Sequence, residues 1–121
     1  MNDIKFSVAI TVYKNDKVEF VKEALDSLIN QTKTPNEIVL LCDGPIPNDI
    51  DNFLRDYENK YSILKVYRNE QNKGLGLALR DCVSYCQYDY IARMDSDDIS
   101  APSRFEKQIN HLVLHQKIYH Q

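Results

Sequence analysis

The sequence predicts an α/β domain whose parallel β-sheet carries helices on both faces. Four short apolar segments rich in β-branched residues alternate with four longer segments whose apolar residues recur at helical spacing. A chain of 121 residues with 43% hydrophobic content is sufficient for one domain with its own core. Since strands that alternate with helices usually pair in parallel, we expect the order βαβαβαβα in a single domain over residues 1–121.

Composition and charge exclude several classes of protein. The net charge of −3 gives no general electrostatic attraction to nucleic acid, so we expect no nucleic-acid partner. No apolar run approaches the roughly 18 residues of a membrane span, and the first residues have no signal-peptide pattern. Three cysteines without framework spacing are typical of a reducing compartment. We therefore expect a cytoplasmic protein.

The first strand and the first helix are predicted from residues 6–13 and 18–32. Residues 6–13 (FSVAITVY) are apolar and β-rich, which indicates a buried strand. Apolar side chains then recur at helical period up to about Thr32. Asp16 and Glu19 have the spacing of a capping box, so we expect the helix to begin beside Asp16.

Turn residues and the same two periodicities divide the rest of the chain. Pro35 and Asn36 indicate a turn, and Pro102 suits the first turn of a helix. The remaining strands are expected over residues 37–43, 63–68 and 90–94, and the remaining helices over residues 48–61, 74–86 and 102–116.

Three carboxylates follow the predicted strand 90–94, at Asp95, Asp97 and Asp98. Such carboxylates repel one another, and a divalent cation with oxygen ligands would offset the repulsion. The Asp-x-Asp spacing lets two side chains of an extended segment point the same way. A helix cap is the plainer interpretation, because Asp and Ser are common at helix starts. Taken alone, this segment leaves both interpretations open.

Notable residues stand at the carboxyl ends of three predicted strands. Thr11 and Tyr13 end the first, Asp43 ends the second, and the acidic cluster follows the fourth. In parallel sheets of this kind, ligands bind beyond these strand ends. An aromatic ring can stack on a base, a carboxylate can accept from a base N–H or a ribose hydroxyl, and a bound metal can bridge a diphosphate. Together these residues favour a nucleotide diphosphate as the ligand.

Four stretches in order resemble the N-terminal, donor-binding half of family 2 glycosyltransferases with the GT-A fold. They are SVAITVYKND, VKEALDSLINQTKTPNEIVLLCDGP, NKGLGLAL and YIARMDSDDISAPSRFEKQ, and they cover nearly the whole chain. The first and last resemble the subgroup that builds bacterial exopolysaccharides and surface glycans. The resemblance implies a Rossmann-like domain that binds a nucleotide-diphospho-sugar, either a UDP- or a GDP-sugar, for inverting sugar transfer.

The resemblance also implies roles for individual residues. Thr11 and Tyr13 would line the base site, and Asp43 would hold the base. Asp95 would contact the ribose side and belong to the metal site, where Asp97 would ligate Mn²⁺ or Mg²⁺ directly. The metal would neutralise charge on the departing diphosphate.

Two departures from the family pattern limit what carries over. Many members have an Ala-Arg-Asn run in the third helix whose Arg approaches the nucleotide, whereas here Ala78 is followed by Leu79 and Arg80. Family members also continue into an acceptor-binding half that supplies the catalytic base. We expect that half to be absent from residues 1–121, which would then hold no catalytic base. Such a chain would bind the donor but not transfer sugar alone, since the glycan acceptor belongs to the complete enzyme.

Two other functions stay open. One is a non-catalytic module that binds a nucleotide sugar. The other is a dinucleotide-binding enzyme domain of the Rossmann type, because Gly74 and Gly76 open a predicted helix and Asp95 follows about twenty residues later. Against it, position 79 is Leu instead of the third glycine of that fingerprint, and the glycines follow the third strand.

Several remaining residues have plainer explanations. His111 and His115 are four apart in the last predicted helix and fit a solvated face better than a metal site. The cysteines fit the role of small buried apolar groups. Leu114 and Ile118 lie opposite the apolar face of that helix, so we expect an exposed patch through which isolated chains self-associate.

A peripheral position at the inner face of a membrane would suit the synthesis of a surface glycan.

Overall fold

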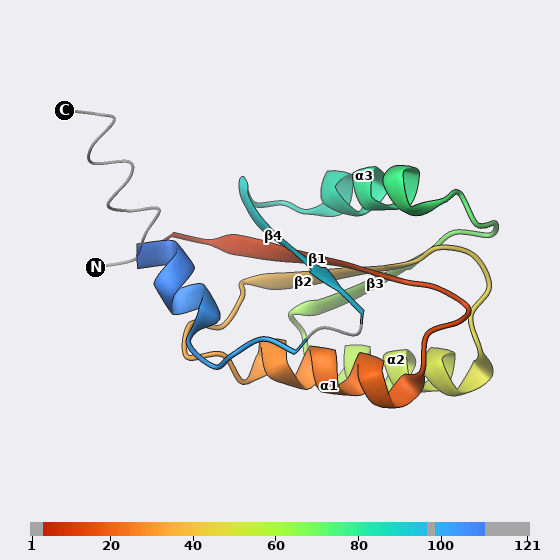
Figure 1. Ribbon diagram of the computed structural model, residues 1–121, viewed down its shortest axis with the longest axis horizontal. Helices are drawn as coiled ribbons and strands as arrows, with labels where there is room; N and C mark the ends of the chain where they lie inside the picture. Colours follow the sequence, from red (N-terminus) through yellow and green to blue (C-terminus); the bar gives the residue numbers. More distant parts are fainter. Residues whose placement is uncertain (1–3, 97–98, 111–121) are drawn as a thin grey trace.

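The computed structural model describes residues 4–96 and 99–110 as one parallel sheet with helices on both faces (Figure 1). The strands are β1 (Phe6–Val12), β2 (Glu37–Cys42), β3 (Leu64–Arg68) and β4 (Tyr90–Asp95), in the spatial order β3-β2-β1-β4. The helices are α1 (Val18–Ile29), α2 (Asn48–Lys60) and α3 (Leu75–Tyr85), and residues 104–110 are also helical. The predicted element order and the parallel pairing are confirmed.

Each face of the sheet has its own core. On the face covered by α1 and α2, the larger core contains Ile10, Leu25 and Leu54, all fully buried (Figure 1). Beneath α3, a smaller core contains Ala78 and Cys82. Burying one large aliphatic side chain contributes about 1.5–3 kcal/mol, so these two layers fix the sheet between the helices. Strands β1 and β2 are buried along their whole length, which explains their almost continuous apolar sequence.

The sheet reverses its winding between β1 and β4. Helices α1 and α2 carry the chain outward from β1 to β2 and β3, and α3 carries it back across the other face to β4 (Figure 1). In doubly wound sheets such a reversal opens a crevice outside the carboxyl ends of the two strands, where ligands bind. The reversal places this crevice beside Thr11 and Asp95, the last pair in the register of β1 with β4.

The predicted capping box is wrong. Helix α1 begins after Lys17, its N-cap residue, and no side chain caps it. Asp16 turns back toward the strand ends, where its Oδ2 accepts hydrogen bonds from the Tyr13 amide at 2.8 Å and from Ser96 Oγ at 2.8 Å. The sequence spacing misled because two donors outside the helix compete for the same carboxylate.

The last predicted helix is anchored, in its described part, to a residue that follows α1. The Gln31 side chain donates through Nε2 to the Ala101 carbonyl at 2.6 Å and accepts through Oε1 from the Phe105 amide at 3.1 Å. Among the described residues, no helix combines the length and the apolar character of a membrane span. Outside the described residues lie the predictions on His111, Leu114, His115 and Ile118, including self-association through the exposed patch.

Candidate functional site

The carboxyl ends of β2, β1 and β4 lie side by side at one edge of the sheet. Thr11 of β1 pairs with Asp95 of β4. The amide of Asp43, directly after β2, donates to the Val12 carbonyl at 2.9 Å. The structure thereby brings three of the predicted site residues to one edge, whereas Asp97 lies outside the described residues.

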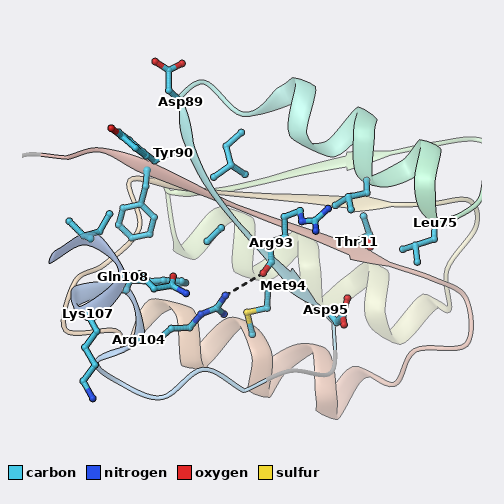
Figure 2. A pocket seen from close by; sticks show the side chains of 16 residues that line it. Thr11, Leu75, Asp89, Tyr90, Arg93, Met94, Asp95, Arg104, Lys107 and Gln108 are labelled. Carbon is cyan, nitrogen blue, oxygen red and sulfur yellow. Dashed lines mark hydrogen bonds between the residues drawn. The ribbon is translucent and has the colours of Figure 1, made fainter. Parts of the chain in front are cut away.

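A cavity of about 1180 Å³ runs along the outer side of β4 and reaches this edge (Figure 2). Thr11, Leu75 and Asp95 line the end nearest the strand ends, and Asp89 and Tyr90 line the opposite end. Within the described residues β4 pairs only with β1, so its other side is open. Pockets for small ligands usually measure roughly 300–1,000 Å³, so this cavity is somewhat larger than a typical small-ligand pocket.

Asp43 holds the loop that follows β3 over the end of β2. Its Oδ1 accepts hydrogen bonds from Asn69 Nδ2 at 3.1 Å and the Lys73 amide at 2.9 Å, and its Oδ2 accepts one from the Gly74 amide at 3.0 Å. Its carbonyl accepts another from Asn72 Nδ2 at 3.2 Å. A carboxylate offers about four acceptor positions, so the chain itself satisfies most of this buried side chain. Contact with the base stays a prediction, while the hold on the loop is direct.

Gly44 lets this loop approach the end of β2 closely. Its φ of +95° lies in the left-handed region, which favours glycine. A Cβ at this position would stand 2.9 Å from the Asn72 amide nitrogen, closer than side-chain carbons come in proteins. Glycine at this position therefore satisfies both the backbone conformation and the contact.

Tyr13 leaves β1 in a turn that Asp16 closes. The Asp16 amide donates to the Tyr13 carbonyl at 3.0 Å, and Asp16 Oδ2 accepts from the Tyr13 amide at 2.8 Å. The Tyr13 hydroxyl is buried and has no hydrogen-bond partner within residues 4–96 and 99–110. Because a buried hydroxyl without a partner costs free energy, this atom gains a hydrogen bond when a polar group reaches it.

Residues 95–98, here called the acidic segment, carry the three aspartates that begin at the end of β4. Hydrogen bonds anchor the chain on both sides of residues 97–98. Before them, Ser96 Oγ donates to Asp16 Oδ2 at 2.8 Å. After them, the Ser100 amide donates to Ser27 Oγ of α1 at 3.0 Å. Both serines are buried, so the two anchors are shielded from water.

A metal site at the end of β4 would depend on Asp95 and Asp97. Asp95 is exposed and borders the cavity (Figure 2). Within residues 4–96 and 99–110, no three or more His, Cys, Asp or Glu side chains form a group that would hold a metal. Carboxylate oxygens are the ligands that Mg²⁺ and similar hard cations prefer. The donor chemistry fits such a cation, and its binding stays a prediction.

The three cysteines have the properties of structural thiols. Burial raises the pKa of Cys42 to about 11, that of Cys82 to about 12 and that of Cys86 to about 11. They therefore stay protonated at neutral pH, without the thiolate that catalysis or metal binding requires. Cys82 donates weakly to the Val39 carbonyl at 3.3 Å beneath α3. Cys42 and Cys82 are buried as expected, and Cys86 is partly exposed.

The cavity includes side chains that sequence reasoning did not assign to a site. Arg93 precedes Asp95 by two positions and lines the same cavity (Figure 2). Side-chain alternation could have found it, because residues i and i+2 of a strand share a face. Leu79 of α3 also lines the cavity, whereas the exposed Arg80 does not. The position where many family members have an arginine is thus apolar in this chain.

Comparison with known proteins agrees with this geometry. The model of the family described as "Glycosyl transferase family 2" matches residues 7–119. The chain is 40% identical over 112 residues to an uncharacterized glycosyltransferase of Haemophilus influenzae, and this match covers 93% of this chain and 42% of that protein. It is 38% identical over 113 residues to the amylovoran biosynthesis glycosyltransferase AmsE of Erwinia amylovora, with the same shares. It is 36% identical over 102 residues to the UDP-Gal:alpha-D-GlcNAc-diphosphoundecaprenol beta-1,3-galactosyltransferase of Escherichia coli, covering 84% of this chain and 37% of that protein.

Solved structures of TarS from S. aureus have the same fold. The structure in complex with UDP-GlcNAc has a TM-score of 0.79 and 25% sequence identity, and the match covers 93% of this chain and 32% of that chain. TarS has also been solved in complex with UDP. The predicted GT-A fold is therefore confirmed. The chain spans less than half the length of each of these relatives.

Proposed function

Because this chain belongs to glycosyl transferase family 2, we propose that it is the donor-binding part of a glycosyltransferase and binds a nucleotide-diphospho-sugar between the ends of β1 and β4. One observation carries the proposal. Thr11 at the end of β1 pairs with Asp95 at the end of β4, where the winding of the sheet reverses. This pairing brings the turn that follows β1 next to the acidic segment, beside the cavity along β4. TarS, which shares the fold, has been solved with UDP and with UDP-GlcNAc.

The base and ribose would lie over the ends of β1 and β2. Thr11 and Tyr13 would line this part of the site, and the buried Tyr13 hydroxyl would gain a partner there. Asp43 would contribute first by fixing the 69–74 loop over the end of β2, because its carboxylate already accepts three hydrogen bonds from that loop. One remaining acceptor position would serve a base N–H.

The diphosphate would lie at the acidic segment, with Mn²⁺ or Mg²⁺ held by Asp97 and Asp95. Both ligands are carboxylates, the donor type that these cations prefer. When bound, the cation supplies a Lewis acid that neutralises charge on the leaving diphosphate. Asp95 is the last residue of β4, so its backbone position is fixed by its pairing with β1.

Transfer itself would be inverting and would need groups beyond this donor site. A base would deprotonate an acceptor hydroxyl, which would attack the anomeric carbon opposite the leaving nucleotide. The names of the relatives support polysaccharide or surface-glycan synthesis as the process, because one acts in amylovoran biosynthesis and another uses a diphosphoundecaprenol-linked acceptor. A cytoplasmic protein acting at the inner face of the membrane would meet such an acceptor.

The dinucleotide-binding alternative has a specific observation against it. In that fingerprint, backbone amides at the start of a helix bind a pyrophosphate. Here the amides of Lys73 and Gly74, before α3, donate to the Asp43 carboxylate at 2.9 and 3.0 Å. An acidic side chain of the protein therefore occupies the place that the pyrophosphate would need.

Calorimetry with UDP, UDP-sugars, GDP and NAD, each with and without Mn²⁺, tests the proposal. We expect a uridine or guanosine diphosphate to bind more tightly with Mn²⁺, and NAD to bind weakly or not at all. Asp97→Asn should remove the Mn²⁺-dependent part of the affinity. Asp89→Asn is the matched control, because Asp89 is exposed at the opposite end of the same cavity. Equal Mn²⁺ dependence in wild type and Asp97→Asn would refute the metal assignment, and tighter binding of NAD would refute the function.

A further inference from the structure

A single carboxylate oxygen joins the turn that follows β1 to the segment that follows β4. Asp16 Oδ2 accepts one hydrogen bond from the Tyr13 amide and another from Ser96 Oγ, each at 2.8 Å. The Asp16 amide also donates to the Tyr13 carbonyl at 3.0 Å, so residue 16 is held against the turn at two points. Hydrogen bonds to an ionised acceptor are about twice as strong as neutral ones, so this link between the two segments is a firm one.

This link begins where the strand pairing stops. The register of β1 with β4 ends at Thr11 and Asp95, and Ser96 is the next residue along the chain. Ser96 is 7% exposed, so its hydroxyl is largely shielded from competing water. Beyond the sheet, the hydrogen bond from Ser96 to Asp16 therefore continues the contact between the two chain segments.

We propose that Asp16 is a positioning residue that couples occupation of the nucleotide site to the position of Ser96, next to Asp95 at the end of β4. A ligand that shifts the Tyr13 backbone also shifts Asp16 Oδ2, and with it Ser96, the residue between Asp95 and Asp97. By linkage, a metal bound at the acidic segment changes the affinity for nucleotide by the same factor as nucleotide changes the affinity for metal. The inference rests on the proposed function, which supplies the two ligands.

Ser96→Ala is the sharpest perturbation, because it removes one hydroxyl and no atom of Tyr13 or Asp16. We expect the gain in UDP affinity on adding Mn²⁺, measured by calorimetry on the chain, to fall about tenfold, the size of one hydrogen bond to a charged acceptor. The affinity for UDP without metal should stay within about twofold. Ser96→Thr keeps the hydroxyl and should retain the gain.

A merely structural role predicts a different pattern. In that case Ser96→Ala would lower thermal stability or metal-free affinity while the gain from Mn²⁺ stayed unchanged, and this result would overturn the coupling. If Ser96→Thr lost the gain as fully as Ser96→Ala, the hydroxyl would not be the link, which also overturns it. Wild-type chain that binds no nucleotide at all would instead refute the proposed function.

Amide exchange without any ligand tests the link even in that last case. The Tyr13 amide donates to the same oxygen that Ser96 Oγ reaches. We expect this amide to exchange about threefold to tenfold faster in Ser96→Ala than in wild type, with Ser96→Thr close to wild type. Exchange at Tyr13 that is the same in all three proteins would overturn the proposal independently of nucleotide and metal.

Discussion

Replacing Asp43 by asparagine should loosen the 69–74 loop while leaving the fold intact. The wild-type carboxylate accepts two hydrogen bonds through Oδ1 and one through Oδ2, all from donors of that loop. An asparagine has one acceptor oxygen, so its NH₂ group must face either the Gly74 amide or the other two donors. At least one of these part-buried donors then loses its hydrogen bond to residue 43, and the remaining bonds lose their charge assistance. The Gly74 amide keeps a second acceptor, Asn72 Oδ1 at 3.0 Å. We expect the free energy of unfolding to fall by about 1–3 kcal/mol.

Urea unfolding and amide exchange measure this effect separately. The amides of Lys73 and Gly74 should exchange faster in Asp43→Asn, because each donates to the Asp43 carboxylate in the wild type. Affinity for UDP should fall as well, since the proposed base site needs this loop in place. Asp89→Asn, at an exposed position, is the control that changes the same charge elsewhere. A free energy of unfolding within about 0.5 kcal/mol of wild type, the range of ordinary surface substitutions, with unchanged exchange at both amides would refute the reasoning.

Three further predictions concern backbone, thiols and activity. Gly44→Ala should lower the free energy of unfolding by about 1–3 kcal/mol, because it adds a Cβ at a positive φ against the loop backbone. Gly76→Ala, in open space within α3, should leave it unchanged or raise it by up to about 1 kcal/mol; equal urea midpoints for the two variants would contradict this. Burial raises the pKa of Cys42 to about 11 and that of Cys82 to about 12, from an ordinary value of 9.0. Keeping these two thiols protonated therefore contributes fully to the free energy of unfolding below pH 9, and this contribution is lost as the pH rises from 9 through 11 to 12. A double Cys→Ala variant should lose that part of the decline in urea titrations between pH 8 and 11, and an identical decline would count against it. The chain should bind donor but transfer no sugar, since base catalysis contributes roughly 10²–10⁴-fold and the base is expected in the acceptor half; acceptor-dependent release of UDP at ordinary enzyme turnover would show otherwise.

Local periodicity was sufficient to predict the sheet and its helices. Residues 6–12 and 37–42 are mostly apolar because they are buried on both faces, and that pattern is visible in the sequence itself. Once the strands alternate with helices, parallel pairing follows, and with it the meeting of the strand ends that carry Thr11, Asp43 and Asp95. The proposed ligand edge was therefore predictable without knowing any long-range contact.

The hydrogen-bond network at that edge was not predictable in the same way. The donors to Asp43 include the backbone amides of Lys73 and Gly74, and a backbone amide has no signature in the sequence. Asp16 had the spacing of a helix cap, yet a serine 80 positions away competes for its carboxylate. The open side of β4 depends on which strands pair, so the cavity beside Arg93 appears only in the folded chain.

The two aspartates at the strand ends show why only one of them suits a metal. Asp43 is 1% exposed, and its carboxylate accepts three hydrogen bonds from the loop beside it. A cation there would have to displace donors whose loss costs several kcal/mol in total, at about 1–3 kcal/mol each. Asp95 is exposed at the end of β4 and borders the cavity. A cation proposed at Asp95 would therefore displace no buried network of this kind, so of the two strand ends the end of β4 fits the proposed metal better than the end of β2.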